Sequence, residues 1–217
     1  MIAYMNEYVA LTTAGGRHTV TGRLVDQSAD LVVLYDGTRF IYVPLVHIAQ
    51  LTRCPPPIRS AEEIPEPPLQ PATELSYRKV LLNAKGVFSE LYVAGNRTIH
   101  GYVTSVMNDF FVFNSPVYRS LYVAMRHLKM LAPFAPLRLP YALERIKLPA
   151  RPAASLARTF DQQLGKLENE FVILNLGEYP RQIGLLKTVD NHLLELVAAD
   201  GTSSYMHLDH VRTIHLP

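Results

Sequence analysis

Short runs of apolar and β-branched residues alternate with polar turns along the first part of the chain. Five such runs lie at residues 7–13, 19–25, 30–35, 38–43 and 45–51. Asp36-Gly37, a frequent two-residue hairpin turn, separates the third run from the fourth, and Pro44 separates the fourth from the fifth. The pattern predicts five short strands joined by tight turns.

The same pattern occurs three times in the chain. The matching segments are residues 20–48, 99–128 and 182–211. In each segment a glycine inside an apolar run precedes a histidine by nearly the same interval. A second glycine, in a predicted turn, comes shortly before the strand glycine. The strand glycines with their histidines are Gly22 with His47, Gly101 with His127 and Gly184 with His210, and the turn glycines are Gly16, Gly95 and Gly177. The coincidences predict a triplicated unit, in which each strand glycine marks a sharp bend or bulge.

Proline-rich segments and short helical patterns separate the three units. Two stretches rich in proline are expected to be extended spacers. Apolar residues near helical spacing predict a helix within residues 73–83 and another within residues 155–167, the second with Ser155 as its N-cap. The predicted organisation is repeat 1 at 1–53, a linker at 54–72, repeat 2 at 73–135, a linker at 136–154 and repeat 3 at 155–217.

Five bent strands within about 50 residues are typical of a small β-barrel. The predicted fold class is therefore mainly β, with three tandem five-stranded small barrels, the second and third preceded by a short helix. A short helix followed by five bent strands is similar to the Sm-like fold. The segment 42–48 and its two equivalents also resemble the second motif of the bacterial RNA-chaperone branch of that fold.

Longer segments resemble the spore coat protein B family of endospore-forming bacteria. They lie at residues 75–86, 92–118, 127–129, 183–191 and 215–217. This resemblance implies a structural component of the outer layers of the spore coat. Larger members of that family carry a Ser- and Lys-rich C-terminal tail, and this chain stops at Pro217, so it is expected to be either a short paralogue or a truncated form.

Composition and charge narrow the classes of function. Hydrophobic residues make up 48% of the chain, so it can form a packed core, and 21 basic residues stand against 19 acidic ones. A chain that neutralises many phosphates usually has a clear basic excess, which this balance does not supply. No apolar run is long enough to span a bilayer, and the N-terminal residues lack the features of a signal peptide, so a protein kept inside the producing cell is expected.

Cys54 is the only cysteine and lies beside Pro55-Pro56-Pro57. One cysteine cannot form an internal disulfide framework. Two interpretations are open, an inert thiol in a linker or an intermolecular disulfide in an assembled, oxidising material.

The repeat histidines carry the alternative interpretation of the chain as an RNA-binding protein. Under that alternative the candidate RNA-binding residues are His47, Arg126, His127 and His210. The structural interpretation is that each histidine packs against or caps the turn between the last two strands of its repeat. The Arg-Gly pair of the second Sm motif is missing from all three repeats, so nucleic acid is not an expected partner.

Other candidate chemistry is weaker. His207 and His210 lie three apart, which places them on opposite faces of a strand, so a metal site with His215 is not predicted. Phe110, Phe111 and Phe113 are either core residues or a platform for stacking bases. The chain has no motif typical of a nucleophile elbow, a phosphate loop or a dinucleotide site, so no catalytic, cofactor or metal residues are predicted.

These interpretations predict a non-enzymatic structural component of the bacterial endospore coat. It is expected to act by self-association, forming a homo-oligomer, and by binding other spore coat proteins, without a membrane partner. Synthesis in the mother-cell cytoplasm and deposition in the spore coat follow from the resemblance. The alternative is an Sm-like RNA-binding adaptor.

Overall fold

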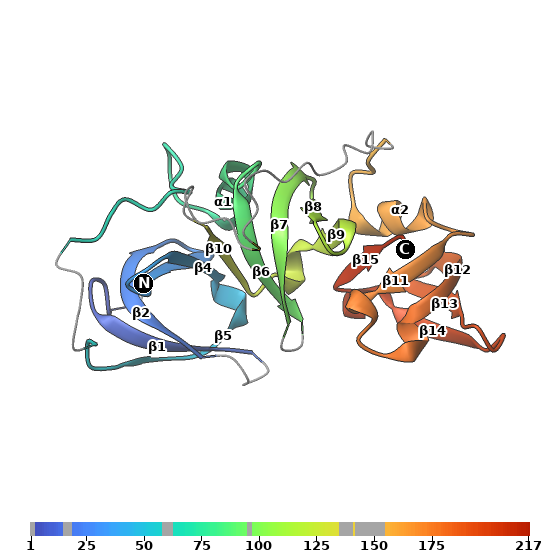
Figure 1. Cartoon of the computed structure of the whole chain (residues 1–217), viewed down its shortest axis with the longest axis horizontal. Coiled ribbons are helices and arrows are strands. Elements are labelled where there is room, and N and C mark those ends of the chain that lie inside the picture. The colour runs from blue at the N-terminus through green and yellow to red at the C-terminus, as the bar shows by residue number, and fades with distance from the viewer. Residues whose placement is uncertain (1–2, 15–18, 58–62, 95–96, 135–140, 142–154) are drawn as a thin grey trace. The chain divides into compact units, whose positions relative to one another are not determined.

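The computed structural model describes residues 3–14, 19–57, 63–94, 97–134, 141 and 155–217, and these residues form a mainly β protein (Figure 1). Within this part of the chain each repeat has five strands, as predicted. Repeat 1 has β1 (Tyr8–Thr13), β2 (Thr19–Gln27), β3 (Leu31–Tyr35), β4 (Phe40–Pro44) and β5 (Ile48–Arg53). Repeat 2 has β6 (Phe88–Ala94), β7 (Arg97–Val106), β8 (Phe110–Ser115), β9 (Arg119–Ala124) and β10 (Met130–Pro133). Repeat 3 has β11 (Phe171–Leu174), β12 (Ile183–Asp190), β13 (Leu193–Val197), β14 (Ser203–His207) and β15 (Thr213–His215).

A single 3₁₀ turn joins the last two strands of every repeat. These turns are η1 (Leu45–His47), η2 (Met125–His127) and η6 (Leu208–His210). Each of them ends at the repeat histidine that the sequence pattern singled out. The histidines therefore mark a shared turn, and the triplication is a property of the backbone as well as of the sequence.

Hydrogen bonds join the described strands in one open antiparallel order, β14-β13-β12-β11-β15-β9-β8-β7-β6-β10-β4-β3-β2-β1-β5. The chain divides into two compact units. Unit 1 comprises Met1–His100 and Leu128–Glu144, and unit 2 comprises Gly101–His127 and Arg145–Pro217. Repeat 1 thus lies in unit 1 and the strands of repeat 3 lie in unit 2, whereas repeat 2 contributes strands to both.

Repeats are joined where the fourth strand of one pairs with the fifth strand of the next. At the first junction, in unit 1, β4 pairs with β10 and Tyr42 lies opposite Leu131. At the second junction, in unit 2, β9 pairs with β15 and Tyr122 lies opposite Ile214. Among the described residues no ladder joins the fourth and fifth strands of the same repeat. The prediction of three small barrels is therefore not confirmed, because a run of apolar residues specifies a strand but not the partner that its edge takes.

The strand glycines lie where two backbones approach closely. A Cβ atom added to Gly101 would lie 2.0 Å from the carbonyl oxygen of Asn114, and Gly22 and Gly184 face equivalent carbonyls at 2.7 and 2.3 Å. In each repeat the ladder between the second and third strands shifts register shortly after this glycine. Each glycine is thus required by a close approach ahead of a β-bulge, which increases the bend of the strand.

Each unit has its own core, and each core contains side chains from two repeats. In unit 1, residues of β1 to β4 pack with Tyr92, Met130 and Ala132 of repeat 2. In unit 2, residues of repeat 3 pack with Phe110, Val112 and Ala124 of repeat 2. Phe110, Phe111 and Phe113 are all 0% exposed, so they are core residues and not a stacking platform. Sharing of apolar residues across the junctions makes neighbouring repeats depend on one another for burial.

The two predicted helices are present as α1 (Tyr77–Asn83) and α2 (Phe160–Gly165). An aspartate at the start of the third strand of the preceding repeat accepts a hydrogen bond from the first residue of each helix. The Asp30 carboxylate accepts from Tyr77 N at 3.0 Å, and the Asp109 carboxylate accepts from Phe160 N at 2.8 Å. These carboxylates satisfy N–H groups that have no partner inside the helix.

The sequence predicted Ser155 as the N-cap of α2, and this prediction was wrong. Thr159 occupies the N-cap position, and the carbonyl and hydroxyl of Ser155 accept hydrogen bonds from Lys166 Nζ. The predicted helix was too long at its start, because the helix begins at Phe160, whose N–H donates to the Asp109 carboxylate.

Part of the first linker is buried rather than solvated. Leu69 is fully buried, and its backbone N–H donates to the Tyr42 hydroxyl at 3.0 Å. Burial raises the pKa of this hydroxyl to about 12. Nearly all of the second linker, 136–154, lies outside the described residues, as do Gly16 and Gly95. Within the described part of the chain, no helix has the length and apolar character needed to cross a membrane.

Candidate functional site at the repeat junctions

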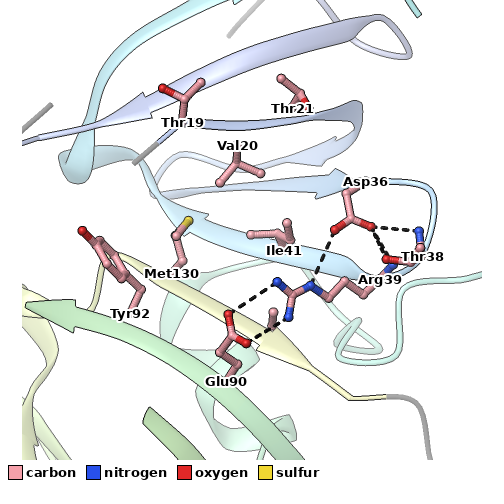
Figure 2. Close-up of a pocket in the computed structure, with 11 residues that line it drawn as sticks. Thr19, Val20, Thr21, Asp36, Thr38, Arg39, Ile41, Glu90, Tyr92 and Met130 are labelled. Atoms are coloured by element: carbon pink, nitrogen blue, oxygen red, sulfur yellow. Dashed lines mark hydrogen bonds and ion pairs between the residues drawn. The ribbon is translucent and has the colours of Figure 1, made fainter. Parts of the chain in front are cut away.

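The first junction contains a pocket in unit 1 of about 330 Å³ (Figure 2). Strand β2 and the β3–β4 hairpin of repeat 1 form one side, and β6 and β10 of repeat 2 form the other. The lining residues are Thr19, Val20, Thr21, Asp36, Thr38, Arg39, Ile41, Glu90, Tyr92, Met130 and Ala132. The pocket is open and bordered by hydroxyl and charged groups, so its chemistry depends on the ionised side chains at its rim.

Arg39 connects the two repeats across this pocket. Its Nη1 and Nη2 atoms donate to the two carboxylate oxygens of Glu90 at 3.2 and 3.4 Å. On its other side Arg39 Nε lies 3.5 Å from Asp36, whose carboxylate also accepts from the backbone N–H groups of Thr38 and Arg39. The hairpin turn predicted at Asp36-Gly37 therefore also positions the guanidinium (Figure 2). A paired Arg–carboxylate contact of this kind fixes geometry as well as charge.

Glu90 is held in its ionised form. His100 Nε2 lies 3.2 Å from the Glu90 carboxylate, and His100 Nδ1 lies 2.9 Å from the Tyr141 hydroxyl. The hydrogen bond with His100 and the ion pair with Arg39 lower the pKa of Glu90 from 4.5 to about 2, although its burial acts in the opposite direction. A carboxylate with this pKa is not poised to exchange protons near neutral pH. The arrangement is suited to holding two repeats together.

The second junction has an equivalent pocket in unit 2 with different chemistry. Its lining residues are Val117, Tyr118, Arg119, Ile173, Leu176, Gly177, Ile183, His215, Leu216 and Pro217. Arg119 occupies the position of Arg39, three residues before the junction tyrosine, but Ile173 occupies the position of Glu90. No acidic side chain is among these described lining residues, so the ion pair of the first junction has no counterpart in this pocket.

His215 is a buried histidine at the second junction and lies opposite Ile173, as Ala132 lies opposite Glu90 at the first. It is 4% exposed, and its ring contacts the Tyr118 ring edge-on with a centroid distance of 5.6 Å. Its Nδ1 atom is buried without a hydrogen-bond partner in the described part of the chain. Burial lowers the pKa of His215, which favours the neutral imidazole.

The structure brings two of the predicted RNA-binding residues together with η6. Arg126 Nη1 lies 2.5 Å from the Asp209 carboxylate, Arg126 Nη2 donates to the Leu208 carbonyl at 2.7 Å, and His127 Nε2 lies 2.8 Å from the Asp209 carbonyl. His210 is exposed beside them, with its carbonyl accepting from Asn175 Nδ2 at 3.1 Å.

His47 ends η1 in the other unit, and its carbonyl accepts from Ala14 N at 2.8 Å. The carbonyls of His47 and His210 and the ring of His127 thus all take part in contacts around the turn between the last two strands. Binding of RNA by His47, Arg126, His127 and His210 remains a prediction.

Sequence reasoning missed Arg39, Glu90 and His100, and it considered His215 only as a possible metal ligand. Arg39 and Arg119 share a place in the repeat pattern and could have been noticed as a pair. Glu90, however, gains its role from a residue that is distant in the chain and belongs to another repeat, and no spacing rule predicts such a contact.

The fold and its junctions define a protein of β-strand repeats that are joined by strand pairing. The chain belongs to the YwrJ family, because it is 39% identical to the Uncharacterized protein YwrJ of Bacillus subtilis (strain 168) over 99% of its own length and 97% of that relative. In addition, residues 159–214 match the family described as the YwrJ third domain. That range begins at the N-cap of α2 and ends within β15, so it spans the third repeat.

Proposed function

We propose that this protein is a non-enzymatic structural component of the bacterial endospore coat, acting through self-association and through binding to other coat proteins. The resemblance of several long segments to the spore coat protein B family motivates the assignment. Membership of a family with a relative in Bacillus subtilis is compatible with it.

Strand pairing between repeats is the observation that carries the proposal. Each junction combines a backbone ladder with a shared apolar core, and the outermost strands β5 and β14 each have one described neighbour. A sheet edge with unpaired backbone groups is a surface on which a further strand can add. A chain built of such junctions is suited to assembly with copies of itself and with similar proteins.

We also propose that each repeat is a variant of the Sm-like fold. In repeats 2 and 3 a short helix precedes five strands, the second strand is bent at a glycine, and a 3₁₀ turn separates the last two strands. The described residues ahead of β1 form a turn instead of a helix. The likeness concerns the order of the elements and carries no function by itself.

Binding of RNA is the less supported alternative. Arg126 would have to release the Asp209 carboxylate and the Leu208 carbonyl before it could contact a phosphate. Titration of labelled single-stranded RNA by fluorescence anisotropy tests the alternative directly. Saturable binding at about 50 mM salt that weakens as salt is added would favour it over the structural role.

Localisation tests the structural proposal. In a sporulating host that produces the epitope-tagged chain, we expect the tag in coat extracts of purified spores and its depletion from spores stripped of their coat. Sedimentation velocity of the purified chain is expected to show oligomers whose size grows with concentration. A chain that remains in the mother-cell cytoplasm throughout sporulation would overturn the coat assignment.

A further inference from the structure

Both junctions place a tyrosine of the fourth strand opposite an aliphatic residue of the fifth strand of the next repeat. The pairs are Tyr42 with Leu131 and Tyr122 with Ile214. The two aliphatic residues are 2% and 0% exposed, and Tyr42 is 1% exposed. The tyrosine–aliphatic pair is thus a shared element of the two junctions, whose pockets otherwise differ in charge.

A third tyrosine occupies the same place without such a partner. Tyr205 on β14 lies five residues before the repeat histidine, as Tyr42 and Tyr122 do, and the ladders place all three opposite the same position of the third strand. Tyr205 is nevertheless 68% exposed. Among the described strands, β14 pairs with β13 and with no other.

A third aliphatic residue lies at the other end of the strand order. Leu51 on β5 pairs with Leu11 on β1, as Leu131 pairs with Leu91 and as Ile214 pairs with Leu174. Leu51 is partly exposed, and β5 has β1 as its one neighbour among the described strands. The outer strand β14 therefore has the tyrosine of a junction, and the outer strand β5 has the aliphatic residue.

We propose that β14 of one copy pairs antiparallel with β5 of a second copy, with Tyr205 opposite Leu51. This inference rests on the self-association in the proposed function and specifies its surface and its register. In this register Ser204 lies opposite Thr52 and Met206 lies opposite Gln50. Contact between two different surfaces of identical chains is heterologous, so each added copy presents the same free edge again, and copies add head to tail into a ring or an open filament.

The outer strands are more polar than the strands buried at the internal junctions. All described residues of β10 and β15 are buried, whereas Ala49, Gln50, Thr52 and Arg53 of β5 and Ser203 and His207 of β14 are exposed. Polar edges protect a sheet from indiscriminate pairing. The junction between copies is therefore expected to be reversible and weaker than the two junctions within the chain.

Tyr205→Ala tests the contact by removing the exposed ring. We expect roughly tenfold weaker self-association in sedimentation velocity, because a tyrosine at the centre of an interface commonly contributes this much. Tyr179→Ala is the matched control, since Tyr179 is 59% exposed in the same unit and lies outside both outer strands. Equal association of the two variants and the wild type would overturn the proposed contact.

Charge pairs test the register. Two same-sign variants, Thr52→Lys with Ser204→Lys and Thr52→Glu with Ser204→Glu, are expected to weaken association because like charges would face each other across the strands. Two opposite-sign variants, Thr52→Lys with Ser204→Glu and Thr52→Glu with Ser204→Lys, are expected to associate like the wild type. Net charge cannot explain this result, because one same-sign variant raises it and the other lowers it.

Cysteine crosslinking tests whether the copies associate head to tail, with β5 of one copy beside β14 of the next. In a Cys54→Ser background, Leu51→Cys and Tyr205→Cys chains are mixed and oxidised, and we expect disulfide dimers that contain one chain of each kind. Dimers formed equally well by either variant alone would overturn the head-to-tail arrangement. If the wild type associates but neither the charge pairs nor the crosslinks behave as expected, this inference fails and self-association stands. A wild type that is monomeric at high concentration would overturn both.

Discussion

The two junctions of the chain share a backbone plan and differ in their electrostatics. Both have a ladder between a fourth and a fifth strand, a tyrosine opposite an aliphatic residue, and an aspartate that accepts from the first N–H of the following helix. The first adds the half-buried Arg39–Glu90 ion pair, and the second has a pocket with Arg119 and the buried His215 but no acidic lining residue among those described. Strand pairing and apolar burial thus define a junction, and the charged contacts vary from one to the other.

Truncation of the junction aliphatic residues is expected to have the largest effect. Leu131→Ala and Ile214→Ala should each lower the free energy of unfolding by about 2–5 kcal/mol, because both side chains are buried and leave a cavity. Urea unfolding followed by circular dichroism measures the loss. Leu51→Ala at the equivalent outer position is the control and should cost clearly less. Similar losses for all three variants would contradict the distinction between internal junctions and outer strands.

Removal of either aspartate that accepts a hydrogen bond from a helix N-terminus is expected to lower the free energy of unfolding by about 1 kcal/mol. In Asp30→Ala and Asp109→Ala the first N–H of α1 or α2 loses its acceptor. Hydrogen exchange should accelerate in the corresponding helix and remain unchanged in the other one. Asp30→Asn and Asp109→Asn keep a side-chain oxygen and should restore most of the protection. Loss of protection in both helices from one substitution would indicate general destabilisation instead.

The Arg39–Glu90 ion pair of the first junction should be stronger than the Arg126–Asp209 ion pair, which joins repeats 2 and 3 outside the second-junction pocket. Double-mutant cycles with alanine are expected to give a coupling of about 1 kcal/mol for Arg39 with Glu90 and about 0.3 kcal/mol for Arg126 with Asp209. The first pair has side chains that are 35% and 22% exposed, whereas those of the second are 48% and 62% exposed. Repetition at high salt should reduce the second coupling more than the first. Equal couplings would remove the electrostatic difference between the junctions.

Acid should weaken the second junction before the first. The pKa of His215 is lowered in the folded protein, so the unfolded chain binds more protons below pH 6.5, and stability is lost as the pH falls from that value. The pKa of Glu90 is lowered to about 2, so its contribution is complete above pH 4.5 and is lost only as the pH falls toward 2.

Hydrogen exchange of β15 and β10 between pH 6.5 and 5 compares the junctions, after correction for the intrinsic dependence of exchange on pH. We expect protection to fall in β15 and to hold in β10, and the effect to be smaller than those above because no side chain is removed. His215→Gln is expected to flatten the dependence in β15. A parallel loss in both strands would show that other groups dominate.

Local pattern was sufficient for much of the fold. The alternation of apolar runs and turns predicted five strands per repeat, and the spacing of glycine and histidine located the bends and the 3₁₀ turns. Helix positions were predicted within a few residues, because the apolar spacing of 73–83 and 155–167 is a local property. The predicted start of α2 near Ser155 was wrong. The first N–H of the helix donates to Asp109, which belongs to the preceding repeat.

The sequence by itself determined the repeating unit of this protein: its five strands, its bending glycines, and the tyrosine and histidine at constant spacing. Only the tertiary structure decided which edges pair, because the backbone N–H and C=O groups of a fourth strand are the same whichever fifth strand they meet. It also decided the roles of Glu90 and His215, which depend on neighbours from other repeats. Burial and charge at a junction arise from two distant segments at once, and a local pattern describes one segment at a time.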